Sequence, residues 1–523
     1  MPGEEKLAGN YQYNTPHNID NTLQSIGFPL VPNATGMSAE VVTYGYDTLQ
    51  RPTTTKGLSD YVTNSRYSLT GKPEQFELST GVKKAWLTYS YEYGTQRLHE
   101  SRTEREGIAG VDRDAIYDYN DAGNLKSITD TSRAGTDTQC FRYDYLQRLT
   151  EAWTPTGACD ADPDKSTLGG PAPYWTSYQY DVTGNRTSET DHGTSAVAAD
   201  TTRTYDYPDP GQGQHQLASV TQTGAAGDRT DTFDYDADGN TTSRQIGNAS
   251  QALTWDDEGH LATTVDSTGT TSYAYDADGN RILRRDPTST TLYLPNMELR
   301  LDKTTNIVTG TRYYTHAATV VAMRTASGVQ FISADPHGSA ELAIDATTQT
   351  ETQRRFTPFG QFRGSPTGIW PNDKGFVGGT IDPDSLTHLG AREYDPDAGR
   401  FISVDPLFDS KNPQSWNGYT YSDNDPPNVS DPTGKNGCVN EPGNSGCRWK
   451  DDSGNTHSST GVVNTGSSGG GGCLDPTCST TNMGRNNSNG VAIPQLVQIS
   501  PHVAVPINGS RFVQVRKPHV ITD

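Results

Sequence analysis

The sequence of 523 residues contains no apolar run near the roughly 18–20 residues that a helix needs to span a bilayer. Only 31% of its residues are hydrophobic, and the mean hydropathy is -0.74. We therefore expect no membrane span and no thick globular core. The first ten residues, MPGEEKLAGN, also lack the apolar segment of a signal peptide. This predicts either another export route or a sequence that is the C-terminal part of a longer chain.

Positive charge is scarce as well. The chain has 41 Lys and Arg against 63 Asp and Glu, a formal net charge of -22. Binding to a phosphate backbone needs clustered basic side chains, so nucleic-acid binding by the body of the protein is not expected. Residues 435–523 differ, because seven basic and five acidic residues give them +2, which leaves -22 - 2 = -24 for the first 434. The imbalance predicts an acidic body and a nearly neutral tail.

Cysteine is rare but paired. The six cysteines form three closely spaced pairs, Cys140 with Cys159, Cys438 with Cys447, and Cys473 with Cys478. Even numbers at short spacing favour disulfides in an exported protein, with free thiols as the alternative.

Signatures of bound metals and cofactors are missing too. No CxxC or HxxxH spacing occurs, so no metal site is expected. No phosphate-binding loop or GxSxG elbow appears, so we expect no cofactor. The isolated His99, His215 and His316 are expected at the surface or in loops.

What the chain does have is tyrosine, glycine and proline. There are 27 Tyr, 53 Gly and 31 Pro, a balance typical of many short strands joined by tight turns. The tyrosines belong to a repeat with the pattern aromatic-x-Tyr-Asp-x-x-Gly-Asn. The clearest copies are YDYNDAGNLKSI (117–128), YQYDVTGNRTSE (178–189), FDYDADGNTTSR (233–244) and YAYDADGNRILR (273–284).

Each copy predicts a β-hairpin of about 20 residues that cannot bury its apolar face alone. Alternation places two aromatic rings on one face of a strand, Asp closes the turn through its own backbone, and Gly supplies the positive φ. Stacked copies would bury one another in an all-β solenoid or wrapped sheet. A sandwich or a propeller is the alternative. The predicted repeat core is Tyr119, Tyr143, Tyr180, Tyr235, Trp255 and Tyr275.

At this point the chain resembles the Rhs/YD-repeat family, which also includes the C components of Tc toxins and the teneurins. Three further stretches strengthen the resemblance, which covers roughly residues 40–434. They are DPHGSAELAIDATTQTETQRRFTPFGQFRG (335–364), THLGAREYDPDAGRFISVDPL (387–407) and NGYTYSDNDPPNVSDPTG (417–434).

The resemblance implies a spiralling shell of β-hairpins with an inward-curling plug, the Rhs-associated core. We accordingly expect an irregular N-terminal segment at 1–40, the repeat shell at 41–330, the plug at 331–434 and a variable, poorly structured tail at 435–523. A Ser/Thr/Gly-rich linker is predicted within the tail at 451–472. The tail is expected to be a truncated or degenerate effector.

In this family the core cuts its own chain just beyond D-P-x-G with two aspartates. The matching residues here are Asp405 and Asp431, with cleavage expected next to Gly434, Lys435 or Asn436. Two nearby carboxyls can share a proton, so that one acts on water while the other protonates the carbonyl oxygen. Arg400 is predicted to hold a carboxylate or polarise that carbonyl. The alternative is that these aspartates only cap turns before proline.

The leading hypothesis is therefore a secreted or cell-surface bacterial toxin scaffold with its own tail as cargo and an immunity protein as a further partner. A second hypothesis is a teneurin-like adhesion protein whose exposed aromatic rings bind cell-surface glycans. A displaced, non-toxic Rhs remnant is the third. Aspartate-dependent self-cleavage is the one enzymatic activity expected under the first hypothesis.

Overall fold

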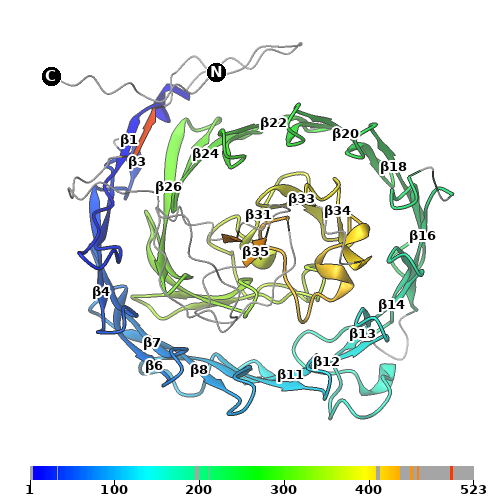
Figure 1. Cartoon of the computed structure of the whole chain (residues 1–523), viewed down its shortest axis with the longest axis horizontal. Helices are drawn as coiled ribbons and strands as arrows, with labels where there is room; N and C mark the ends of the chain where they lie inside the picture. Colours follow the sequence, from blue (N-terminus) through cyan, green and yellow to red (C-terminus); the bar gives the residue numbers. More distant parts are fainter. Residues whose placement is uncertain are drawn as a thin grey trace.

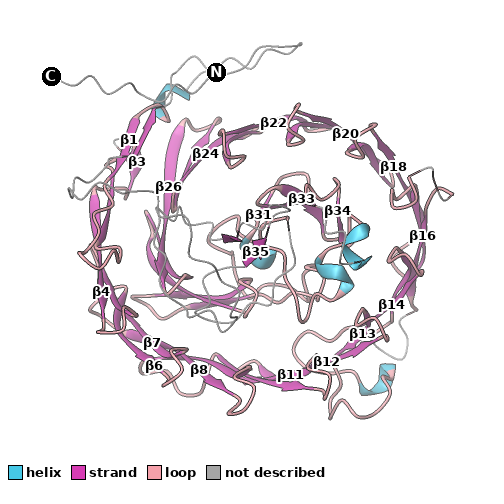
Figure 2. Cartoon of the chain, in the orientation of Figure 1, coloured by secondary structure: helices cyan, strands magenta, loops and turns pink. Residues whose placement is uncertain are grey.

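The computed structural model describes residues 4–31, 33–194, 199–209, 211, 213–407 and 413–435, and three short strands at 448–450, 456–458 and 495–498. The predicted all-β fold is confirmed: strands make up the ring, and helical turns are confined to a few short segments (Figure 2). No helix in these ranges is long and apolar enough to cross a membrane.

One strip of sheet forms the shell, and nearly every strand in it pairs antiparallel with its neighbour in sequence. Its strands are β2 (Ser25–Phe28), β3 (Ala34–Thr35), β4 (Glu40–Tyr46), β5 (Pro52–Lys56), β6 (Val62–Tyr67), β7 (Pro73–Ser79), β8 (Lys84–Tyr91), β9 (Leu98–Arg105), β10 (Arg113–Tyr119), β11 (Leu125–Ser132), β12 (Gly135–Tyr143), β13 (Leu149–Trp153), β14 (Trp175–Tyr180), β15 (Arg186–Asp191), β16 (Thr201–Asp206), β17 (Ser219–Gly224), β18 (Arg229–Tyr235), β19 (Thr241–Ile246), β20 (Ala249–Trp255), β21 (Leu261–Asp266), β22 (Gly269–Tyr275), β23 (Arg281–Arg285), β24 (Ser289–Leu294), β25 (Met297–Asp302), β26 (Ile307–His316), β27 (Thr319–Thr325), β28 (Gly328–Ala334), β29 (Ala340–Asp345) and β30 (Glu351–Gln353).

Smaller elements complete the fold. The plug contains one sheet, made of β31 (Thr380–Ile381), β32 (Thr387–Leu389), β33 (Arg392–Asp395) and β34 (Arg400–Phe401). Two further sheets have two strands each. In one, β1 (Asn10–Tyr13) pairs with β37 (Gln495–Gln498), and in the other β35 (Arg448–Lys450) pairs with β36 (Thr456–Ser458). The 3₁₀ turns are η1 (Glu4–Lys6), η2 (Lys165–Thr167), η3 (Phe376–Gly378), η4 (Pro413–Trp416) and η5 (Ser422–Asn424).

The turn between β18 and β19 shows how the repeat sequence builds a hairpin. Oδ1 of Asp236 accepts the main-chain N–H groups of Asp238 at 3.0 Å and Asn240 at 2.8 Å. Gly239 has a φ of 87°, in the left-handed region that favours glycine. The Asp-x-x-Gly-Asn part of the repeat therefore encodes a tight turn.

The repeat aromatics bind each hairpin to the one before it. The Tyr hydroxyl or Trp N–H donates to a main-chain carbonyl at or just before the start of the preceding hairpin's returning strand. The donor–acceptor pairs are Tyr46–Leu23, Tyr67–Pro52, Tyr91–Pro73, Tyr119–Leu98, Tyr143–Leu125, Tyr180–Leu149, Tyr207–Arg186, Tyr235–Leu217, Trp255–Thr241 and Tyr275–Leu261, at 2.6–3.2 Å.

A β-bulge precedes many of these aromatic residues, and it bends the sheet. The strand register shifts immediately before Tyr119, Tyr143, Tyr180, Tyr235, Trp255 and Tyr275. A bulge increases the local twist of a strand and bends it. Because the bulge recurs with the repeat, the strip closes on itself as the ring seen in Figure 1.

The strip overlaps itself after one turn. β26 lies inside the start of the shell and pairs in parallel with β3 (Figure 1). The buried Glu40 of the first turn accepts hydrogen bonds from Tyr61, Tyr314 and Arg312 at 2.6–2.8 Å. His316, expected at the surface or in a loop, instead lies buried in β26 and bonds Thr55 and Ser65, both at 2.8 Å. That expectation was wrong because a second sheet layer covers this histidine.

The plug lies inside the ring, as predicted (Figure 1). Two expected boundaries differ from the observed elements. Shell strands β28–β30 continue the sheet beyond residue 330 to Gln353 because they keep pairing with the preceding strands. Residues 1–40, expected to be irregular, contain β1, β2 and β3, and both β2 and β3 join the shell sheet.

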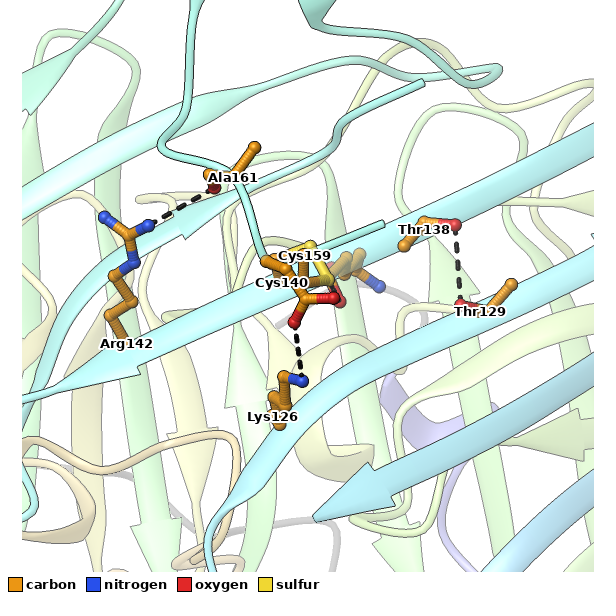
Figure 3. Close-up of a disulfide and its surroundings, with 9 residues drawn as sticks. Lys126, Thr129, Thr138, Cys140, Arg142, Cys159 and Ala161 are labelled. Carbon is orange, nitrogen blue, oxygen red and sulfur yellow. Dashed lines mark hydrogen bonds and ion pairs between the residues drawn. A yellow bond between two sulfur atoms is a disulfide. The ribbon is translucent and has the colours of Figure 1, made fainter. Parts of the chain in front are cut away.

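A disulfide joins Cys140 in β12 to Cys159 in the long connection between β13 and β14 (Figure 3). Arg142 of β12 donates to the Ala161 carbonyl at 3.3 Å, beside the disulfide (Figure 3). Closing a loop of this length stabilises a fold by about 3 kcal/mol. The other four cysteines and Asn436 lie outside the described residues. Of the predicted linker at 451–472, the structure describes only the short strand β36.

Buried ion pairs attach the plug to the shell. Asp382 of the plug lies 2.6 Å from a nitrogen of Arg281 and 2.8 Å from one of Arg284. All three side chains are almost fully buried. A buried carboxylate is stable only when paired, so this contact fixes where the plug sits.

We predict that Asp382→Ala lowers the free energy of unfolding by about 3–5 kcal/mol, because it leaves Arg281 and Arg284 buried without their shared carboxylate. The measurement is a denaturant titration of the full chain. Asp162→Ala is the control, since Asp162 is 92% exposed in its pair with Arg142 and should change stability by less than about 1 kcal/mol. Equal effects of the two changes would contradict the anchoring role.

Candidate functional site

Arg392, in plug strand β33, brings the two predicted aspartates together. Its Nη2 lies 2.7 Å from Oδ2 of Asp405 and 3.1 Å from Oδ2 of Asp431. Its guanidinium stacks on the ring of Phe401, 3.6 Å from the centroid, which holds it flat between the carboxylates. One nearly buried cation therefore holds both acids in one site.

The chain around Asp405 and Asp431 fixes their side chains. Oδ1 of Asp405 accepts the N–H of Leu407 at 2.8 Å, which closes a local turn. This turn follows the end of β34. Oδ1 of Asp431 accepts the hydroxyl of Thr433 at 3.0 Å. Both aspartates do close turns, as the alternative interpretation held, yet their remaining oxygens point to a common arginine.

The peptide bond at which cleavage is expected, Gly434–Lys435, contacts both Arg392 and Asp431. The carbonyl oxygen of Gly434 accepts from Nε of Arg392, and the N–H of Lys435 donates to Oδ1 of Asp431 at 3.1 Å. The preceding residue is also fixed, since the Thr433 carbonyl accepts the N–H of Ala391 at 2.9 Å. Both ends of the Gly434–Lys435 peptide bond thus contact the Arg392 cluster.

The surroundings of the Asp405 carboxyl favour its protonated form. Burial raises the pKa of Asp405 to about 6, against the opposing effect of Arg392, and the nearby Asp431 adds to the rise. The Asp405 side chain still keeps 17% of its surface exposed, so water can reach it. A carboxyl that holds a proton near pH 6, beside a second carboxyl, is an arrangement suited to acid–base catalysis.

The predicted role of Arg400 was wrong. Arg400 donates to the hydroxyl of Tyr207 at 3.2 Å and to the carbonyl of His215, so it links plug and shell rather than holding the aspartates. Arg392 makes the contacts that the sequence analysis had predicted for Arg400. Both arginines lie in the same stretch, THLGAREYDPDAGRF, and spacing alone could not show which one faces Asp405.

One group of metal-type ligands lies elsewhere in the described ranges. Asp256, Glu258 and His260 bring oxygen and nitrogen atoms within 4.8 Å of one another between β20 and β21. Oδ1 of Asp256 accepts the N–H groups of Glu258 and His260, as the equivalent Asp does in other repeat turns. Turn formation therefore accounts for this group.

Comparison with known proteins agrees with the YD repeat and the shell that it builds. The family model for the teneurin YD-shell matches residues 173–427. Toxin subunit YenC1 of Yersinia entomophaga is 28% identical over 397 residues. These matches support the resemblance to Rhs/YD-repeat proteins.

The similarity to YenC1 covers 65% of this chain but 39% of the relative, so the chain spans about two-fifths of that protein. The crystal structure of TcdB2-TccC3-Cdc42 superposes with a TM-score of 0.59 at 19% identity, over 80% of this chain and 21% of the other. The Tc holotoxin pore of Photorhabdus luminescens with a TccC3 variant gives 0.60 at 19% identity, over 82% and 21%. These structures share the YD-shell fold.

We predict that Gly434→Ala displaces the Gly434–Lys435 peptide from the site. Gly434 has a φ of 62°, and an added Cβ would lie 2.3 Å from the Leu389 carbonyl oxygen. Hydrogen exchange of the Ala391 N–H should therefore accelerate at least tenfold, because its acceptor on Thr433 moves away. The change is made in an Asp405→Asn chain, so that the expected self-cleavage cannot alter the measurement.

The matched control is Gly259→Ala, where φ is 81° and nothing lies within 4 Å of the added Cβ. It carries the same backbone strain without the steric contact. Unchanged exchange at Ala391 in the Gly434 variant would show that this peptide is not held against β33.

Proposed function

We propose that this chain is the shell-and-plug part of a toxin that encloses its own C-terminal segment and cuts it free after Gly434. The contact of Arg392 with Asp405, Asp431 and the Gly434 carbonyl carries this proposal. The similarity to a toxin subunit and to TccC3-containing structures supports it. The disulfide between Cys140 and Cys159 supports an exported protein.

The geometry supports an aspartyl-type hydrolysis. Asp431, ionised, takes a proton from water as the water oxygen attacks the Gly434 carbonyl carbon. Asp405, protonated, gives its proton to the carbonyl oxygen, while Arg392 stabilises the charge that develops there.

The intermediate then collapses. Asp431 passes the proton to the nitrogen of Lys435, which it already contacts, and the carbon–nitrogen bond breaks. Asp405 recovers its proton from the intermediate's hydroxyl. The products are a Gly434 carboxyl group and a free Lys435 amine, and no atom beyond one water is consumed.

A non-cleaving, teneurin-like surface protein that binds glycans is the second candidate function. The teneurin YD-shell match over residues 173–427 favours it. Under this proposal the ion pairs of Arg392 with Asp405 and Asp431 would only stabilise the fold of the plug. The intact mass of the purified chain separates the two candidates, because only the first predicts a cut.

We predict that the purified chain separates into two products cut between Gly434 and Lys435, and that Asp405→Asn, Asp431→Asn and Arg392→Gln each keep it at 56.6 kDa. Each change removes one member of the proton-transfer or charge-stabilising group, which should slow cleavage at least 100-fold. Intact mass spectrometry reads the result. Arg400→Gln is the control and should still be cut, and an uncut parent chain would favour the surface protein.

Cleavage should also depend on pH. Since the proposed role of Asp405 needs its protonated form, and its pKa is raised to about 6, the rate should be lost as pH rises through 6 and fall about tenfold per unit above it. Timed samples of chain unfolded in denaturant and refolded at pH 5 to 9 provide the rates. A rate that stays flat from pH 6 to 8 would argue against Asp405 as the acid.

A further inference from the structure

Residues 414–428 of the plug, just before Asp431, are hydrogen-bonded to a row of shell turns. The side chains of Gln414, Asn417, Tyr419, Asn424 and Asn428 make these contacts. Their partners are the Leu146 carbonyl at 2.9 Å, Oδ1 of Asn185 at 2.9 Å, the Gly239 carbonyl at 2.6 Å, the Gly184 carbonyl at 3.0 Å and the Leu125 N–H at 2.6 Å, in that order. These partners come from four different repeat hairpins.

Two of these contacts flank the residue that positions the cleavage group. Between Asn417 and Tyr419 lies Gly418, whose carbonyl oxygen accepts from Nη1 of Arg392 at 2.8 Å and from the N–H of Asp405 at 2.9 Å. A Gly418 carbonyl that moved would therefore release both Arg392 and Asp405. The position of this carbonyl depends on shell turns on either side.

Asn185 closes its own shell turn and also contacts the plug. In the β18–β19 turn, the matching Asn240 donates to the Asp that opens its own turn. Asn185 makes the same bond to Asp181 at 2.9 Å, and its oxygen additionally accepts from Asn417 of the plug. The side chain is nearly buried, so this second contact is shielded from water.

The backbone after Tyr419 is held in a costly conformation. Ser422, Asp423 and Asn424 are consecutive non-glycine residues with φ of 50°, 53° and 63°. Left-handed conformations cost about 1–2 kcal/mol per residue and persist only where the surroundings impose them. The bond from Asn424 to the Gly184 carbonyl is one such restraint, and it comes from the same shell turn as Asn185.

We propose that the shell turns at 181–185 and 236–240 complete the cleavage site, so that the chain cuts itself only after these hairpins have closed around the plug. Asn185, Asn417 and Tyr419 are positioning residues that act through Gly418 on Arg392 and Asp405. This proposal rests on the proposed self-cleavage. Its consequence is that cargo is released into a shell that has already formed.

The first test removes one hydroxyl from the plug–shell contact. Tyr419→Phe loses the bond to the Gly239 carbonyl and keeps the ring, so cleavage should slow about tenfold. The matched control is Tyr46→Phe, which loses a similar bond to the Leu23 carbonyl within the shell, at 2.9 Å, and should cleave within twofold of the parent. Rates are measured on the full chain during refolding, and melting temperatures show that both variants fold.

The pH profile distinguishes positioning from general destabilisation. The pKa of Asp405 is raised mainly by burial, so a loosened Gly418 contact admits water and should move the pH midpoint of cleavage downward by about half a unit in Tyr419→Phe. Tyr46→Phe should leave that midpoint unchanged.

A double-mutant comparison covers the case in which Tyr419→Phe does not fold. Asn417→Ala should slow cleavage about tenfold in the parent and have a much smaller effect in an Asn185→Ala chain, because the hydrogen bond between the two side chains is already absent there. Independent effects of the two changes would overturn the proposal.

The outcomes separate the two proposals. If the parent chain is never cut, the proposed function fails. If the parent is cut and Asp431→Asn is not, but Tyr419→Phe matches Tyr46→Phe in rate and in pH midpoint, self-cleavage stands and the role of the shell turns is overturned.

Discussion

The hydrogen bond from each repeat aromatic to a main-chain carbonyl of the preceding hairpin is the interaction on which the rest of the structure depends. A single hairpin of this length cannot bury its apolar face. The Tyr hydroxyl or Trp N–H ties one hairpin to the next, and the bulge before it bends the sheet. A chain with only 31% hydrophobic residues can therefore build a large ring, because each copy adds a polar clamp along with little apolar area.

Buried arginines form the ion pairs that hold the overlapping turns together, attach the plug to the shell and order the inside of the plug. Arg312 pairs with Glu40 where the two turns overlap, Arg281 and Arg284 hold Asp382 of the plug, and Arg392 gathers Asp405 and Asp431. Arginine suits all three places, because its planar guanidinium can serve two acceptors and stack on an aromatic ring. The Arg392 cluster thus pairs buried charges as the plug–shell contacts do, and the Gly434–Lys435 peptide bond contacts it.

Much of this was predictable because the relevant patterns are local. Asp, Gly and Asn at fixed offsets encode the turns, and the aromatic spacing predicts stacked hairpins, as Tyr235 and Asp236 show. The junction motifs indicated the family and the two aspartates. Arg392 was missed in favour of Arg400 since both flank Tyr394 in one short motif, and only the path of β33 and β34 decides which one faces Asp405. His316 was misplaced because its covering layer comes from strands more than 200 residues away in sequence.

The sequence by itself determined the repeat, its turn chemistry and the acidic body, since all of these depend on residue types at short spacing. Asp405 and Asp431 were indicated by the family resemblance of the junction motifs. Tertiary structure decided where the strip overlaps itself, which arginine joins the aspartates, and which shell turns hold the segment before Asp431. Those contacts join residues far apart in the chain, such as Asn185 with Asn417. Their geometry follows from the accumulated curvature of many hairpins, which no single stretch of sequence specifies.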